Sequence, residues 1–132
     1  EILSIKRVAA PEISPDGRQV AYTVRETNWD DNAYETEIWV ADATGPAASP
    51  PRQLTNSRQS SLSPAWSPDG SRLAFISDRT DKRQVYLINL LGGEADALTS
   101  IEDGGQPRIV SSTFKMEPDG SKFKPTGCEV VR

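Results

Sequence analysis

A recurring turn sequence constrains the fold of this chain more than any other feature. Ser14–Gly17 reads Ser-Pro-Asp-Gly, the same residues return at Ser67–Gly70, and Glu117–Gly120 carries a variant that begins with Glu. Successive prolines stand 53 and then 50 positions apart. Proline presets φ near about −65°, and glycine supplies the positive φ that closes a tight turn between antiparallel strands. The predicted turn residues are Pro15, Asp16 and Gly17, then Pro68, Asp69 and Gly70, then Pro118, Asp119 and Gly120.

Other landmarks repeat in phase with this turn. Gln19–Thr23 matches Arg72–Ile76, Glu37–Val40 matches Gln84–Leu87, and Leu54–Thr55 matches Leu98–Thr99. A period of about 40–50 residues with several short apolar runs is typical of propeller blades. These runs are nearly continuous, which indicates strands buried on both faces, as stacked blades require. We therefore predict an all-β fold made of β-propeller blades, each a four-stranded antiparallel sheet.

The repeat divides the chain into segments. Residues 1–10 form a lead-in, blade one covers 11–55, blade two covers 62–99, and 105–132 hold a degenerate partial third blade or tail. Strands are expected near 11–14, 19–26, 36–43 and 51–55 in blade one, and near 63–67, 72–77, 83–90 and 95–99 in blade two. The chain thus encodes about two complete blades of an incomplete propeller.

The third repeat departs from the pattern. Met116 stands where the second repeat has Trp66, and Lys124–Cys128 replaces the apolar strand expected after the turn. Proline at position 125 would remove a ladder donor from a central strand. A truncated gene, an altered reading frame and a spliced tail would each produce such a decay.

Four aromatic side chains are predicted to pack between blades: Trp39, Trp66, Phe75 and Tyr86. Propellers close with roughly four to eight blades. Two blades leave sheet faces uncovered, so Tyr22, Trp39, Phe75 and Tyr86 are expected to reach solvent there. Exposed apolar patches drive association. The isolated chain is therefore expected to form a homo-oligomer, to aggregate or to fold only in part. The alternative is an open, monomeric two-blade stack capped by residues 1–10 and 105–132.

Charge and hydropathy exclude two classes of partner. The chain has 15 Lys and Arg against 19 Asp and Glu, a net charge of −4, which disfavours binding to a nucleic acid backbone. No apolar run approaches the roughly 18 residues of a membrane span. The lone Cys128 permits no internal disulfide. The compartment stays open, with the cytoplasm favoured over the periplasm.

The chain contains no histidine, which excludes every catalytic scheme that depends on an imidazole. It also lacks a Gly-x-Ser-x-Gly elbow. We predict no catalytic, cofactor-binding or metal-binding residue in this chain. The acidic loop Asn28–Asn32 matches no established calcium loop and is interpreted as a solvated turn rather than a cation site.

Up to about residue 100, the chain resembles the N-terminal β-propeller of the prolyl oligopeptidase family of serine peptidases, especially its acylaminoacyl-peptidase-like branch. The resemblance rests on Ile5–Val8 leading into Pro11–Gly17, then Val20–Val24, Glu37–Val40, Pro51–Thr55, Trp66–Phe75 and Ser77–Arg79. TolB-like propellers share the blade motif. The lead-in that runs straight into blade one, followed by a long early insertion, favours the peptidase family.

The resemblance implies a propeller that gates the access of short peptides to an α/β-hydrolase domain, which supplies the catalytic Ser, Asp and His. No position here matches those residues, and Glu35 and Glu37 are no convincing match to the paired glutamates of the dipeptidyl branch. The implied partners are the missing catalytic domain or further blades. The alternatives are a TolB-like protein-interaction propeller and a truncated product without a function of its own.

The purified chain alone should hydrolyse neither acyl-peptide nor proline-containing chromogenic substrates, because it has no histidine to activate a serine. Release of the chromophore is the measurement. Turnover that survives repurification and is blocked by a serine-directed inhibitor would contradict this prediction.

Overall fold

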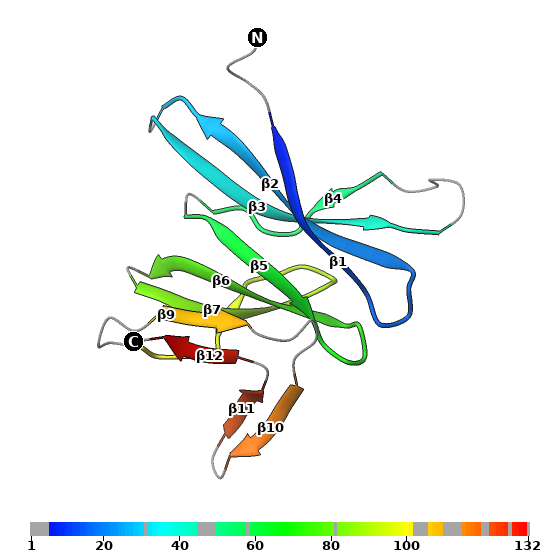
Figure 1. The fold of residues 1–132 in the computed structure, drawn as a ribbon, viewed down its shortest axis with the longest axis vertical. Helices are drawn as coiled ribbons and strands as arrows, with labels where there is room; N and C mark the ends of the chain where they lie inside the picture. The colour runs from blue at the N-terminus through cyan, green and yellow to red at the C-terminus, as the bar shows by residue number, and fades with distance from the viewer. Residues whose placement is uncertain are drawn as a thin grey trace.

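A computed structural model shows that the chain is built from antiparallel sheets (Figure 1). The structure describes residues 6–30, 32–44, 50–57, 59–80, 82–101, 106–109, 115–119, 122–126 and 128–131. Within these ranges every regular element is a strand. None of the described residues belongs to a helix long and apolar enough to cross a membrane. The predicted all-β class is confirmed.

Two four-stranded sheets form the two blades, each with its strands in chain order. Blade one consists of β1 (Arg7–Ile13), β2 (Gln19–Asn28), β3 (Ala33–Asp42) and β4 (Arg52–Gln53). Blade two consists of β5 (Ser61–Trp66), β6 (Arg72–Thr80), β7 (Lys82–Asn89) and β8 (Asp96–Ala97). The prediction of propeller blades made of four antiparallel strands is confirmed, and the propeller is not closed.

Strand bounds differ from the expected ones at both edges of a blade. β1 begins at Arg7, inside the predicted lead-in, because β2 continues far enough for Arg7 to pair with Arg25. β4 has only two residues, because the amides of Leu54 and Thr55 both donate to the carbonyl of Ile38 and the ladder ends there.

The third repeat does not form a four-stranded sheet. β9 (Gln106–Ile109) pairs with β12 (Cys128–Val131), and β10 (Lys115–Asp119) pairs with β11 (Lys122–Thr126). The sequence predicts no strand after the third turn, and this prediction is wrong. β11 forms there, and its Pro125 pairs with Met116 of β10. A strand of a two-stranded sheet has a free edge, where proline is tolerated.

The third turn also differs from the first two. Pro118 and Asp119 lie in β10 opposite Phe123 and Lys122, rather than in a turn, and Gly120 lies outside the described residues. The sequence offers a reason, because Glu117 stands where the first two copies have a serine hydroxyl.

In each of the first two turns, the serine hydroxyl links the aspartate of the turn to the strand that follows. Ser14 Oγ donates to Asp16 Oδ1 (2.5 Å), and the Gln19 amide donates back to Ser14 Oγ (3.1 Å). The Gly17 amide closes the turn on the Ser14 carbonyl (2.9 Å), and Gly17 has φ of 73°. Pro15 lies in the same turn.

The second copy repeats these bonds. Ser67 Oγ donates to Asp69 Oδ1 (2.7 Å), the Gly70 amide donates to the Ser67 carbonyl, and Gly70 has φ of 74°. The Ser67 hydroxyl, and then the amide and hydroxyl of Ser71, lower the pKa of Asp69 to about 2. Pro68 lies in this turn.

The first strand of each blade carries a bulge at the same place in the repeat. The pairing of β1 shifts between Ala9 and Glu12, and that of β5 shifts between Leu62 and Ala65. Ala10 and Ser63, each followed by proline, adopt positive φ values of 51° and 56°. A bulge bends its strand and increases the local twist.

The main core lies between the two blades. Blade two contributes large side chains to it, while blade one contributes small or β-branched ones. The Trp66 ring is fully buried, and its Nε1 donates to the Glu12 carbonyl of blade one (2.9 Å). The Phe75 and Tyr86 rings stack at 5.8 Å. The buried members are Ala21, Ile38 and Val40 from blade one, and Trp66, Leu73, Phe75, Tyr86, Ile88 and Leu90 from blade two.

A second core covers the opposite face of blade two. Ala65, Ala74, Ile76, Val85 and Leu87 are buried there, with Leu98 and Ile109 packed against them. The solvent exposure expected for Phe75 and Tyr86 is wrong, because both side chains belong to the main core and face blade one. Tyr22 and Trp39, on the far face of blade one, are half-buried.

We call the main core between the two blades the seam. Trp66→Ala should destabilise the chain by about 3–5 kcal/mol, because it leaves a cavity in this seam. Gly70→Ala should cost about 1 kcal/mol, from the positive φ alone, because an added Cβ meets nothing within 4 Å. Equilibrium denaturation measures both, and equal small losses would contradict the assignment of the seam.

Candidate functional site

The two ends of the strands in each blade carry different turns and different side-chain contacts. The Ser-Pro-Asp-Gly turns of both blades project from one end, and the β2–β3 and β6–β7 turns lie at the other (Figure 1). The links that leave β4 and β8 also reach the second end. Side-chain networks and a hollow between the blades are found at that end.

A buried carboxylate anchors this end of blade one. Thr55 Oγ1 donates to Glu37 Oε2, and the Ser57 amide donates to Glu37 Oε1 (2.8 Å). The Ile38 amide in turn donates to Thr55 Oγ1 (2.9 Å). Burial raises the pKa of Glu37 above its ordinary value, against the opposing influence of Thr55, Ser57 and the Arg79 guanidinium.

Blade two builds the same network around a neutral side chain. Thr99 Oγ1 donates to Gln84 Oε1 (2.6 Å), and so does the Ile101 amide (2.9 Å). The Val85 amide donates to Thr99 Oγ1 (3.0 Å), while Gln84 Nε2 donates to the Ile101 carbonyl (2.9 Å). The repeated Leu-Thr sequence therefore holds the segment that follows the last strand of each blade against the third strand of that blade.

Arg79 is a structural side chain that the sequence did not single out. Its guanidinium lies 5.0 Å from the centroids of both the Phe75 and Tyr86 rings, and Nη2 donates to Ser61 Oγ (3.0 Å). Nε donates to Ser77 Oγ (3.3 Å). In the sequence, Arg79 stands out only as the end of the Ser77–Arg79 segment of the family resemblance, which predicts none of these contacts.

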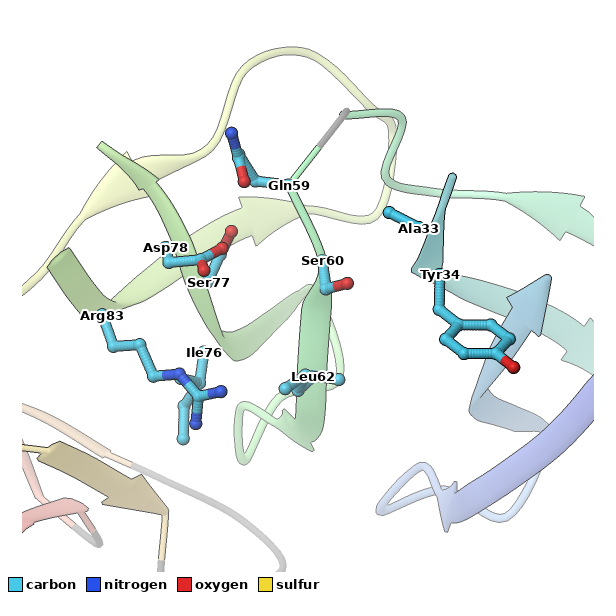
Figure 2. A pocket seen from close by; sticks show the side chains of 9 residues that line it. All are labelled: Ala33, Tyr34, Gln59, Ser60, Leu62, Ile76, Ser77, Asp78 and Arg83. Carbon is cyan, nitrogen blue, oxygen red and sulfur yellow. The ribbon is translucent and has the colours of Figure 1, made fainter. Parts of the chain in front are cut away.

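A hollow of about 290 Å³ opens where the two blades meet at this end. Figure 2 shows Ala33 and Tyr34 at the start of β3, opposite the Ser60 side chain just before β5. Ala33 points toward Ser60, and the Tyr34 ring points away from it. Its remaining lining comes from blade two and the link before it: Gln59, Leu62, Ile76, Ser77, Asp78 and Arg83. Tyr34 is 62% exposed, and the Arg25 guanidinium lies 3.9 Å from the centroid of its ring.

The hollow offers polar contacts but no activated nucleophile. Ser60 Oγ already accepts the Thr36 amide (3.2 Å), and Ser77 Oγ accepts from Arg79. No imidazole exists in the chain to act as a base. Hydroxyls, an arginine and a carboxylate around a small apolar floor can contact a peptide or a neighbouring domain. They cannot carry out acyl transfer by a serine–histidine mechanism.

The acidic residues considered from the sequence have other roles. Glu35 accepts from Asn28 Nδ2 (2.5 Å), and Glu37 is held by Thr55 and Ser57, so neither offers a free carboxylate pair. The Asn28 side chain also accepts the Asp30 amide (3.0 Å). Among the residues that the structure describes, no cluster of metal-ligating side chains occurs.

Glu37→Gln should retain the network, because Gln84 occupies the equivalent position in blade two. The carboxylate pKa is raised on folding, so wild-type stability falls as the pH rises from the ordinary value through the raised one. The variant should therefore be as stable or about 1 kcal/mol more stable at pH 7, and lose this advantage near pH 4.

Thermal unfolding across pH 4–8 measures this difference. Glu37→Ala is the matched control, because it removes the acceptor from the Thr55 hydroxyl and the Ser57 amide and should destabilise at every pH. A Glu37→Gln variant that is less stable at pH 7 and recovers in acid would contradict the argument.

Comparison with known proteins places this geometry among propellers. The "uncharacterized peptidase YuxL" of Bacillus subtilis is 38% identical over 124 residues, covering 93% of this chain and 18% of that protein. A Tol-Pal system protein TolB from Alkalilimnicola ehrlichii is 38% identical over 84 residues, covering 64% of this chain and 18% of that protein. The chain thus spans less than a fifth of either relative.

A solved structure shares the fold. The acylaminoacyl peptidase of Pyrococcus horikoshii superposes with a TM-score of 0.60 at 20% identity, covering 86% of this chain and 16% of that one. Peptidase propellers and TolB, the two groups that the sequence resembles, are therefore both represented among similar proteins. The model of the PD40 family, described as the TolB beta propeller domain, matches residues 4–124. The chain belongs to the PD40 family of β-propeller domains.

Proposed function

We propose that this chain forms part of the propeller of a serine peptidase of the prolyl oligopeptidase type. In that role it limits which peptides reach an α/β-hydrolase domain carried elsewhere in the polypeptide. The observation that carries the proposal is the 38% identity to a peptidase along 93% of the chain. That similarity reaches beyond the two blades, while blades themselves are shared with other propellers.

The interior of the chain supports a scaffolding role. The buried polar side chains of the described residues all have hydrogen-bond partners, most of them within the repeat networks. In the hollow between the blades, Ser60 Oγ accepts the Thr36 amide and Ser77 Oγ accepts from Arg79. A rigid wall of stacked sheets suits a filter, because exclusion by size needs no chemistry from the wall itself.

A TolB-like interaction propeller is the second candidate function. The similarity to TolB at 38% identity favours it, although that match covers only 64% of the chain. In this case the exposed Tyr34 and Trp29, near the β2–β3 turn, would contact a partner protein instead of a hydrolase domain. Hydrolysis by the longer protein separates the two functions.

The test is to express the longer protein that carries this chain and assay a series of peptides of increasing length with the same cleavable residue. The expected result is hydrolysis that a serine-directed inhibitor blocks and that falls steeply with peptide length. Trp66→Ala, which loosens the seam between the blades, should relax the length limit while cleavage of the shortest peptide is retained.

Trp29→Ala is the matched control, because this tryptophan is 58% exposed at the β2–β3 turn and leaves the seam intact. A longer protein that hydrolyses no peptide would overturn the peptidase assignment. A length dependence identical in wild type and Trp66→Ala would overturn the gating role alone.

A further inference from the structure

The hollow between the blades contains two charged side chains of opposite sign that do not pair with each other. Asp78 of β6 is half-buried, and Arg83 of β7 is exposed. Among the described residues, neither of them takes part in an ion pair. Figure 2 shows Asp78 on the same side of the hollow as Gln59. The Arg83 side chain extends to the other side, toward Leu62 and Ile76.

Two serine hydroxyls of the hollow keep a proton that they can donate. Ser60 Oγ accepts the Thr36 amide (3.2 Å), and Ser77 Oγ accepts from Arg79 Nε (3.3 Å). A hydroxyl has one donor in addition to its acceptor lone pairs. Within the described part of the chain, neither hydroxyl donates a hydrogen bond. Each can therefore donate to a carbonyl or carboxylate oxygen of a ligand.

The outer edge of β3 is open beside the hollow. The amides of Thr36 and Ile38 both donate to side chains on the side of β3 that is turned away from β2. Alternate residues of a strand turn their backbone groups to the same edge, and β3 pairs with β2 without a register shift through Tyr34. The N–H and C=O of Tyr34 therefore face this outer edge. β4 pairs with Trp39 and Val40, so no described strand pairs with Tyr34 there.

These features fit a small ligand that has a positive end, a negative end and a polar backbone between them. A guanidinium forms charge-assisted hydrogen bonds with a carboxylate, and a carboxylate forms them with an ammonium group. An extended peptide can pair its backbone with an open strand edge. The volume of the hollow, about 290 Å³, is at the lower end for ligand pockets, which suits two peptide residues better than a longer chain.

We infer that the hollow binds a dipeptide with both termini free. Its ammonium group lies against Asp78, its carboxylate lies against Arg83, and its amide faces the open edge of β3 at Tyr34. The side chain of its second residue is apolar, because Leu62 and Ile76 form the floor toward which Arg83 extends. The inference goes beyond the proposed function, since the 132-residue chain carries the whole site and binding needs no hydrolase domain.

Isothermal titration calorimetry of the 132-residue chain tests the inference, with alanyl-leucine as the probe. Two capped forms of the same dipeptide are the comparison. N-acetyl-alanyl-leucine lacks the ammonium group, and alanyl-leucine amide lacks the carboxylate. The free dipeptide should bind about tenfold more tightly than either capped form, because each cap removes one charge-assisted contact.

Two variants assign each end of the dipeptide to its side chain. Arg83→Gln should weaken binding of the free dipeptide about tenfold and leave binding of the amide unchanged. Asp78→Asn should weaken binding of the free dipeptide similarly and leave binding of the acetylated form unchanged. The matched controls are Arg72→Gln and Asp42→Asn, which lie at the other end of the strands and should not change the affinity. Thermal unfolding at the wild-type midpoint shows that each variant is folded.

Several results would overturn the inference. They are the absence of measurable alanyl-leucine binding, equal affinity for the free and capped forms, and a loss of affinity in the controls as large as in Arg83→Gln and Asp78→Asn. A requirement for the carboxylate without the ammonium group would also overturn it, because the hollow would then be a site for simple anions.

Failure of the proposed function is recognised separately. If the chain binds the free dipeptide but the longer protein hydrolyses no peptide in the inhibitor-controlled assay, the dipeptide site stands and the peptidase assignment does not. If the longer protein hydrolyses peptides but the chain binds no dipeptide, the reverse holds.

Discussion

The seam between the two blades is the interaction on which the rest of the structure depends. An isolated sheet of this kind would leave both faces of a continuous apolar strand in water, which no blade can offset alone. Trp66 resolves this for the two blades by filling the space between them and donating its indole N–H to the Glu12 carbonyl. The bulge at Ala10 lies just before that carbonyl, in the strand that the indole reaches.

The repeated sequence landmarks form two small hydrogen-bond networks in each blade. Serine and aspartate of the Ser-Pro-Asp-Gly sequence bond to each other and to the returning strand, which fixes the first hairpin of each blade. The threonine hydroxyl of the Leu-Thr sequence donates to the side chain of Glu37 or Gln84 and accepts the amide of the next residue in the third strand, which holds the last strand in place. Together these bonds hold the two ends of both four-stranded sheets, and the apolar residues between them pack in the core that joins the blades.

Sequence reasoning recovers what local chemistry determines. The two complete turns, the four-stranded sheets and the buried Trp66 follow from residues that are close in the chain or equivalent in the repeat. The positive φ values of Ala10 and Ser63 do not follow, because alanine and serine have no intrinsic preference for them and strand register imposes the bulge. The contacts of Arg79 do not follow either, because they depend on two ring faces, on Ser77 in the same strand and on Ser61 in the neighbouring β5.

The exposure of Phe75 and Tyr86 was misjudged for a related reason. The sequence gives the number of blades but not which face of each sheet is turned toward its neighbour, and Phe75 and Tyr86 lie on the face of blade two that packs against blade one. The hollow near Tyr34 was equally beyond reach, since it is assembled from β3 and from the segment around β5 and β6. The proposed function is argued from the similarity to a peptidase, because the described residues form a scaffold of hydrogen-bonded sheets.

We expect the Trp66 seam to join the two sheets into one cooperative unit. Native-state hydrogen exchange of Trp66→Ala tests it most directly, because amide protection is read separately in β2–β3 of blade one and in β6–β7 of blade two. Both sheets should lose protection by a similar factor, although the substituted residue belongs to blade two. Loss confined to β6–β7, with β2–β3 protected as in the wild type, would contradict it.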